Sequence, residues 1–187
     1  MQVDWSGLRA ALARLRAEKQ SLPMWWRDDD AIKPTAALAR LTALSDAIGM
    51  PVHIAVIPAS ATKALAEHQK SNQCLVPLVH GWKHINNAPP DAKKSEFGTP
   101  RQTGLAEPGH ARTRMQKLFG ADFLPLFVPP WNRLDPMFLP ALKAAGFLGV
   151  SSFTPRQAPE AIAGLCQINT HVDPIDWRGT RCLLYTS

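Results

Sequence analysis

Two polar motifs, each placed directly after an apolar run, constrain how this chain can fold. The acidic run 28–30 follows the apolar run 22–26, and His80 and His84 follow the apolar run 74–79. Short apolar runs of this kind are typical of buried strands in a parallel sheet. The carboxyl ends of parallel strands lie at one edge of the sheet, where α/β proteins place their sites. We therefore expect the acidic and imidazole groups to meet at that edge.

The two motifs together predict a metal site. Three adjacent carboxylates repel one another unless a cation offsets the repulsion. Histidines four residues apart can share one face of a helical turn, and two imidazoles with one carboxylate form the open three-ligand site of hydrolytic zinc. A divalent ion, with Zn²⁺ as the expected one, follows from this donor set. The alternatives stay open, because an acidic run is often a solvated turn and an HxxxH pair can arise by chance.

The rest of the chain alternates between strand and helix patterns, which favours parallel β/α units. The expected strands are 22–27, 51–57, 74–79, 124–128, 147–152 and 165–169, and the expected helices are 35–48, 59–69, 110–119 and 136–145. No glycine-rich phosphate loop follows any of these strands, so NAD and ATP functions are disfavoured. The prediction is an α/β fold, a distorted (β/α) barrel that is incomplete at its C-terminus. The segment 85–108, rich in proline and glycine, is expected to be a loop beside the site.

Composition sets the broad class of the protein. At 187 residues and 45% hydrophobic content, the chain is expected to form a single domain, 1–187, that begins with an amphipathic helix over 1–20. The net charge of +6 is scattered over helical segments rather than concentrated, which argues against a nucleic-acid partner. The three cysteines have no metal-ligand or redox spacing, and no apolar run is long enough to span a bilayer. A cytoplasmic protein with no membrane partner is expected, and its oligomeric state is left open.

Four blocks of residues, in order along the chain, carry a family resemblance. Residues 26–30 are similar to a Thr-Phe-Asp-Asp-Gly block, and His80-Gly81-Trp82-Lys83-His84 is similar to a His-Ser/Thr-x-x-His block. Residues 128–131 are similar to Arg-Pro-Pro-Tyr, and 173–177 match Asp-x-x-Asp-Trp. In this order the blocks resemble the polysaccharide deacetylases, the metal-dependent amide hydrolases that act on chitin and peptidoglycan.

The first two blocks imply the metal site and the base. The resemblance implies that Asp28 is the catalytic base and that Asp29 is a metal ligand together with His80 and His84. A frame shifted by one residue gives these two roles to Asp29 and Asp30 instead. The second block has a glycine, Gly81, where the family has a hydroxyl residue.

The third and fourth blocks imply supporting residues. Pro130 gives a rigid turn, and the backbone N–H of Trp131 is expected to help hold the oxyanion. The family arginine is absent from this block, and Arg27 or Arg133 is a candidate to replace it. Asp173 and Asp176 are expected to support the site, with an N-cap as the alternative role of Asp176.

Two further roles remain to be filled. The family's final Leu-x-His block, which supplies a general-acid histidine, has no copy here, so His171 is the fallback acid and the chain is expected to be a fragment that lacks the last barrel units. A purely structural role for His171 in its loop is equally open. Trp82 and Trp131 lie inside the site blocks and are candidates for walls on which a sugar ring stacks.

The resemblance implies a function, metal-dependent removal of acetyl groups from an N-acetylated carbohydrate. Two alternatives remain. One is a non-catalytic carbohydrate-binding relative that keeps the barrel, and the other is a hydrolase of small or cyclic amides that uses the same ligands.

Overall fold

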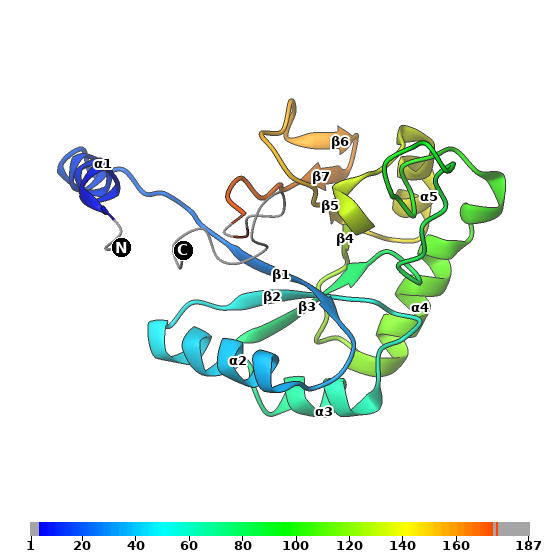
Figure 1. Cartoon of the computed structure of the whole chain (residues 1–187), viewed down its shortest axis with the longest axis horizontal. Helices are drawn as coiled ribbons and strands as arrows, with labels where there is room; N and C mark the ends of the chain where they lie inside the picture. The colour runs from blue at the N-terminus through cyan, green and yellow to red at the C-terminus, as the bar shows by residue number, and fades with distance from the viewer. Residues whose placement is uncertain (1–3, 174, 176–187) are drawn as a thin grey trace. The chain divides into compact units, whose positions relative to one another are not determined.

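The computed structural model describes residues 4–173 and 175 of the chain. The chain divides into two compact units. The first, residues 26–171, contains the whole sheet (Figure 1). The second contains α1 (Ser6–Ala17), which lies within the predicted first helix and has no buried residue. None of the helices in the described part of the chain has the length and apolar character needed to cross a membrane.

Seven strands form one mostly parallel sheet, ordered β1-β2-β3-β4-β5-β7-β6. Neighbouring strands are parallel except for β6 and β7, which are antiparallel. The strands are β1 (Trp26–Ala31), β2 (Val52–Val56), β3 (Leu75–His80), β4 (Leu126–Val128), β5 (Gly149–Val150), β6 (Glu160–Ile162) and β7 (Leu165–Gln167). In the described residues β1 and β6 are the two edges, so the sheet does not close. The predicted α/β fold, an open and distorted (β/α) barrel, is confirmed.

The sheet is strongly curved, and one side chain demonstrates this. Arg27 on β1 donates from Nη1 to Ser151 Oγ, at 2.8 Å, just beyond the end of β5. In a flat sheet, four strand spacings would separate these positions by about 19 Å. Only a sheet rolled toward a barrel brings β1 and β5 within reach of one arginine.

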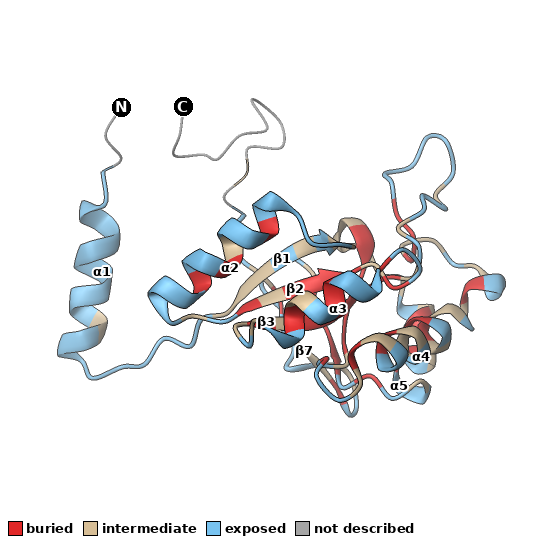
Figure 2. Cartoon of the chain, turned by 90° about the horizontal axis from the view of Figure 1, so that it is seen from below, coloured by how far each residue is buried: buried red, intermediate tan, exposed pale blue. Residues whose placement is uncertain are grey.

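The helices lie outside this curved sheet, and their ends follow from the sequence (Figure 1). They are α2 (Ala36–Ile48), α3 (Lys63–Lys70), α4 (Glu107–Phe119) and α5 (Leu139–Ala144), with short 3₁₀ turns η1 (Gln102–Gly104), η2 (Pro130–Asn132) and η3 (Pro136–Phe138). Thr35 caps α2 by accepting from Leu38 N, and Gly49 ends this helix in the left-handed conformation. Figure 2 shows the buried residues on the central strands and on parts of the helices.

A chain of edge-to-face aromatic pairs fills the core. The ring of Phe97 lies 5.2 Å from that of Phe127 and 5.1 Å from that of Phe138, and Phe127 lies 5.4 Å from Phe147. Phe97 is fully buried although it belongs to the irregular segment 85–108. Residues 95–97 of that segment are therefore packed into the domain, whereas residues 85–94 are mostly exposed, as expected for a loop.

The observed strands differ from the sequence-based expectation in several boundaries and in one additional strand. The expected strand 22–27 is observed at Trp26–Ala31, and it continues through the acidic run because pairing with β2 extends to Val56. Strand β6, residues Glu160–Ile162, was not expected. Its pattern carries no apolar alternation, and it forms only as the antiparallel partner of β7.

Replacing Phe97 with alanine is expected to destabilise the domain by about 3–5 kcal/mol, since the change removes a buried ring and leaves a cavity. Urea unfolding monitored by circular dichroism measures the loss. The matched control is Phe153→Ala, whose ring is 38% exposed and for which a loss below about 1 kcal/mol is expected. Equal losses for the two variants would contradict the assignment of Phe97 to the core.

Candidate metal centre

A β-bulge shapes the acidic run. Asp28 pairs with Ile54 and Ala31 pairs with Val56, so two residues of β1 stand opposite one residue of β2. Asp30 adopts φ 73°, the left-handed conformation that aspartate tolerates better than most residues. The extra residue breaks the strict alternation of side chains along the strand. Asp29 and Asp30, although adjacent, can therefore both serve the same side of the sheet.

The bulge brings Asp30 to the two histidines. Asp30 Oδ1 lies 3.1 Å from His80 Nε2 and 3.2 Å from His84 Nε2. These three side chains offer ligand atoms that all lie within 4.8 Å of one another. The imidazoles lower the pKa of Asp30, mainly through its hydrogen bond with His80. The side chain of Asp30 is still 61% exposed, so the cluster is open to solvent on one side.

Each histidine is held in a definite orientation. His80 ends β3 with its side chain 2% exposed, and its Nδ1 lies 3.0 Å from the carbonyl oxygen of Val128. The contact of Nδ1 with that carbonyl orients the ring, so that Nε2 is the nitrogen that faces Asp30. His84 has φ 57°, and its ring lies 4.3 Å from that of Trp131.

Asp29 belongs to a second cluster, centred on Arg27. Arg27 Nε lies 2.9 Å from Asp29 Oδ1, and Nη2 donates to Asp29 Oδ2 at 3.0 Å. The same guanidinium donates from Nη2 to Asn132 Oδ1 at 2.8 Å, and its side chain is only 5% exposed. An ion pair supported by a hydrogen bond from the guanidinium orients a carboxylate, and Asp29 Oδ1 is left without a hydrogen-bond partner. Of the two candidates to replace the family arginine, Arg27 contacts Asp29, whereas Arg133 donates to the carbonyl of Lys94, and the replacement itself stays a prediction.

The structure therefore differs from the first of the two sequence frames. The carboxylate that reaches the histidines is that of Asp30, and Asp29, the first-frame ligand, pairs with Arg27. Asp28, the first-frame base, is not one of the three residues of the cluster, and it lines a shallow groove together with Asp29, Asp30 and Lys33. The bulge is the physical reason for the shift, and the geometry agrees with the second frame.

The pKa of the Asp28 carboxyl group is raised above its usual range. Partial burial, followed by repulsion from Asp29 and Asp30, raises its pKa to about 6. No hydrogen bond or ion pair to Asp28 is found within the described residues to offset this repulsion.

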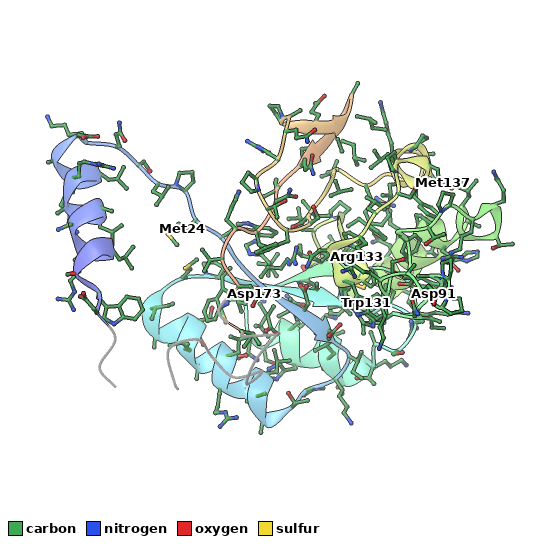
Figure 3. The ribbon with its side chains drawn as sticks, turned by 45° about the horizontal axis from the view of Figure 1, so that its top comes forward. Met24, Asp91, Trp131, Arg133, Met137 and Asp173 are labelled. Atoms are coloured by element: carbon green, nitrogen blue, oxygen red, sulfur yellow. The ribbon has the colours of Figure 1, made fainter. Side chains whose placement is uncertain are left out.

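The loop after β4 forms the opposite wall of the site. Trp131 and Asn132 both have positive φ, 57° and 56°, which is uncommon for consecutive residues other than glycine. This conformation lets Trp131 pack on His84 while Asn132 accepts from Arg27. Figure 3 shows Trp131 and Arg133 on the segment that follows β4. Pro130, the preceding residue, is buried.

Trp82 and His171, two further predicted residues in the unit that contains the sheet, are not among the three residues of the metal cluster. Trp82 follows His80 and contacts the ring of His110 at 5.9 Å. His171 is exposed, beyond Thr170 at the end of the β7 segment. Asp173, in the other compact unit, accepts from Ile175 N, and Asp176 lies outside the described residues. The roles proposed for His171, Asp173 and Asp176 remain predictions.

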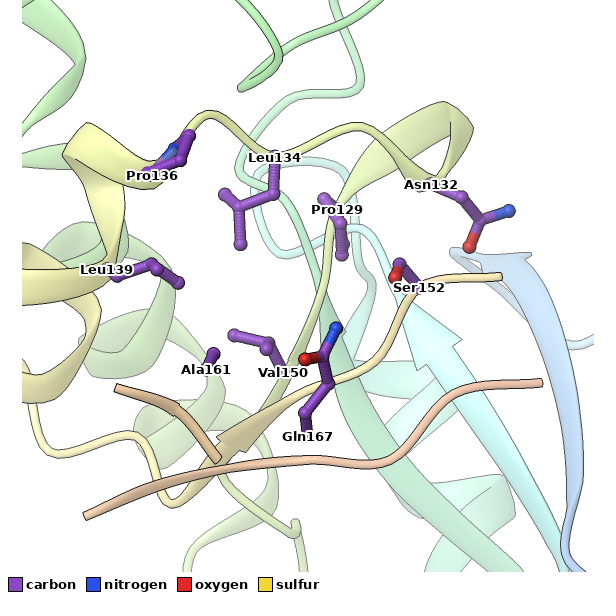
Figure 4. Close-up of a pocket in the computed structure, with 9 residues that line it drawn as sticks. All are labelled: Pro129, Asn132, Leu134, Pro136, Leu139, Val150, Ser152, Ala161 and Gln167. Atoms are coloured by element: carbon purple, nitrogen blue, oxygen red, sulfur yellow. The ribbon is translucent and has the colours of Figure 1, made fainter. Parts of the chain in front are cut away.

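A cavity of about 230 Å³ lies near the site but does not contain the metal cluster (Figure 4). It is lined by Pro129, Asn132, Leu134, Pro136, Leu139, Val150, Ser152, Ala161 and Gln167. Ser151 points toward Arg27, so its neighbours Val150 and Ser152 point to the other face of the sheet. The cavity adjoins the site through Asn132 and Ser152, which both accept hydrogen bonds from Arg27.

Three residues that contribute to the site were not identified from the sequence. Asn132 and Ser151 hold Arg27, and Glu96 binds the turn that carries His84. Asn132 adjoins the third block, but no pattern marks Ser151 or Glu96. Their partners lie 124 and 13 residues away, so only the folded chain reveals these contacts.

The donor set of the cluster fits a divalent metal ion. Two neutral imidazoles and one carboxylate, with solvent access on the open side, are the ligands of catalytic zinc sites. The hydrogen bond from His80 Nδ1 to a backbone carbonyl is the outer contact that metal-binding histidines usually make. Asp30, His80 and His84 are the residues that would hold the ion.

Comparison with solved structures shows the same fold in deacetylases. A de-N-acetylase from Aggregatibacter actinomycetemcomitans aligns with a TM-score of 0.59 at 12% identity, over 91% of this chain and 77% of that one. The Streptococcus pyogenes deacetylase PplD, in complex with acetate, aligns with a TM-score of 0.55 at 16% identity, over 87% and 71%. A family 4 carbohydrate esterase from Streptomyces lividans, also in complex with acetate, aligns with a TM-score of 0.51 at 15% identity, over 79% of this chain and 78% of that one.

Sequence comparison alone finds less. No family model and no curated protein matches the chain. At 12–16% identity, the structural likeness shows the fold. It confirms, at that level, the resemblance to polysaccharide deacetylases that the four sequence blocks predicted.

Removing one ligand should abolish tight metal binding. Asp30→Ala and His84→Ala are each expected to weaken Zn²⁺ binding by more than about 100-fold, because loss of outer contacts alone typically costs about 10–100-fold. Calorimetric titration of the metal-free protein measures this. Asp28→Asn is the control and should bind as the parent does, since its side chain is not in the cluster. A parent-like affinity for Asp30→Ala would contradict the ligand assignment.

The titration of Asp28 predicts a pH-dependent stability difference in the metal-free protein. A folded-state pKa raised to about 6 means that ionising Asp28 lowers stability as pH rises from about 4 through 6. Asp28→Asn should therefore raise the melting temperature at pH 8 and have little effect near pH 4. Thermal melts with excess chelator test this. Asp91→Asn, at an exposed loop carboxylate, should show no such trend.

Proposed function

We propose that this protein is a metal-dependent hydrolase that removes acetyl groups from an N-acetylated carbohydrate. One observation supports this above all. An Asp-His-His cluster lies beside a second, arginine-held aspartate, at the carboxyl ends of the strands in a fold shared with deacetylases. The neighbours PplD and the family 4 esterase were both solved with acetate, the product that such a reaction releases.

The residues divide into those that hold the metal ion and those that handle the proton. Asp30, His80 and His84 would hold the ion. When bound, a divalent ion at these ligands supplies a Lewis acid that polarises the acetyl carbonyl and makes water a better nucleophile.

Asp29 is the proposed general base, in place of Asp28. Its carboxylate is adjacent to a proposed metal ligand in sequence and is oriented by two contacts from Arg27. Such a carboxylate can take a proton from the attacking water without being displaced, because Arg27 is itself fixed by Ser151 and Asn132. Arg27 is therefore a positioning residue for the base.

Two tryptophans and a backbone amide are proposed to receive the substrate. The backbone N–H of Trp131 would donate to the developing oxyanion. The ring of Trp131, already packed on His84, and that of Trp82 offer apolar faces of the kind on which sugar rings stack. His171 is the proposed acid for the leaving amine, on the strength of its place at the end of the β7 segment.

Asp29→Asn should lower kcat by about 10²–10⁴-fold, the usual contribution of a general base, while leaving Zn²⁺ affinity nearly unchanged. Acetate release from chitooligosaccharides, peptidoglycan fragments and small acetamides measures the activity. The matched control is Asp28→Asn, which should keep most of the parent's activity. A larger loss of kcat in Asp28→Asn than in Asp29→Asn would instead identify Asp28 as the general base.

The same substrate panel separates the alternatives. Turnover of small or cyclic amides alone would favour an amide hydrolase of another class. Metal and sugar binding without release of acetate from any substrate would favour the non-catalytic carbohydrate-binding relative.

A further inference from the structure

A buried carboxylate lies beneath the turn that carries His84. Glu96 is only 2% exposed, yet no ion pair to it is formed by any cationic side chain in residues 4–173 and 175. Its oxygens instead accept from two successive backbone amides, Lys83 N at 2.7 Å and Trp82 N at 3.1 Å. Burying a charged group is costly unless it is fully hydrogen-bonded, so this placement requires a structural or functional reason.

The turn that Glu96 binds has a conformation that needs support. Gly81 and His84 both have positive φ, 56° and 57°, at the two ends of residues 81–84. Successive backbone N–H groups in such a turn point to one side and form a concave anion site. A carboxylate in that site satisfies two donors at once and fixes the path of the chain from His80 to His84.

Glu96 is itself held by a short strap, defined as residues 95–98. The carbonyl of Glu96 accepts from Asn87 Nδ2 at 3.2 Å, and Ser95 N donates to Asn86 Oδ1 at 3.0 Å. Phe97 O accepts from Asp135 N at 2.7 Å, in the segment that follows Trp131. The strap thus links the His84 turn to the loop that forms the opposite wall of the site.

Gly81 and Glu96 fit each other closely. A Cβ atom at position 81 would overlap Glu96 Oε2 and the ring of Pro130. A hydroxyl side chain, which the related motif has at this place, cannot be accommodated here while Glu96 keeps its position. The absence of a side chain at Gly81 is therefore what allows Glu96 to reach the backbone of this turn.

We propose that Glu96 is a positioning residue of the metal centre, whose carboxylate fixes the turn 81–84 and so holds His84 ready to bind the ion. This inference rests on the metal site of the proposed function. It gives segment 85–108, which is otherwise only a long connection, a specific role. The buried glutamate replaces, from a distant place in the sequence, the support that a hydroxyl at position 81 would give locally.

The decisive variant is Glu96→Gln, which preserves volume but leaves one of the two backbone amides facing an NH₂ group. Zn²⁺ affinity should fall by about 10-fold, and in Glu96→Ala by about 10–100-fold, in the range known for outer-sphere contacts. The visible absorption of bound Co²⁺ should also change, because a shifted His84 alters the ligand geometry. Calorimetry and Co²⁺ titration of the full chain give both values without any activity assay.

Glu107→Gln is the matched control. Glu107 pairs with Arg101, whose Nε donates to the backbone carbonyl of Glu96, but neither residue contacts the turn, so the variant should be destabilised without a change in metal affinity or in the Co²⁺ spectrum. Glu96→Gln with a parent-like spectrum and an affinity within about twofold of the parent would overturn the proposal. So would a Glu96→Gln variant that fails to fold while Glu107→Gln folds, since Glu96 would then serve the fold in general.

The outcomes separate this inference from the proposed function. A parent protein that binds Zn²⁺ but releases no acetate, with weaker binding in Glu96→Gln, overturns the deacetylase function and supports the role of Glu96. A parent protein that releases acetate, together with a Glu96→Gln variant that binds Zn²⁺ as the parent does, supports the deacetylase function and overturns the role of Glu96. A parent that binds no Zn²⁺ overturns both.

Discussion

The buried guanidinium of Arg27 is the interaction on which the geometry of the site depends. It joins the first strand to the end of the fifth, through Ser151, and to the loop after the fourth, through Asn132. It also holds Asp29, through a hydrogen bond from Nη2 and an ion pair with Nε. A buried arginine is stabilising only when its donors are satisfied, and here they are satisfied only if the sheet is curved. The same contacts that roll the sheet therefore orient the proposed base, so that fold and site are formed by one set of hydrogen bonds.

Five residues around the site share a left-handed backbone conformation, which is a second constraint on its geometry. Asp30, Gly81, His84, Trp131 and Asn132 all have φ between 56° and 73°. Residues other than glycine occupy this region at a cost of roughly 1–3 kcal/mol each and keep it only when their surroundings enforce it. The surroundings here are the bulge in β1, the carboxylate of Glu96 and the hydrogen bond to Arg27. Local strain is thus concentrated where side chains from three different loops must converge.

The proposed metal site and the proposed base occupy separate but adjoining networks. Asp30 is tied to the histidines, while Asp29 is tied to Arg27, and the two carboxylates are neighbours in the chain. One residue of extra length in β1 produces this division. The bulge allows Asp30 to serve as the proposed ligand while Asp29, which precedes it, stays available to accept a proton. A regular strand would not permit this, because its successive side chains point to opposite faces.

The sequence by itself determined the alternation of strands and helices, the pairing of an acidic run with two histidines, and the resemblance to deacetylases, because these depend on local periodicity and on short motifs. It also left two frames open for the aspartates. Only the tertiary structure shows which carboxylate lies beside the histidines, because the bulge that brings Asp30 there arises from pairing with β2 and leaves no signal in Asp28-Asp29-Asp30 alone. The roles of Ser151 and Glu96 likewise depend on contacts between distant segments, for which one sequence carries no signal.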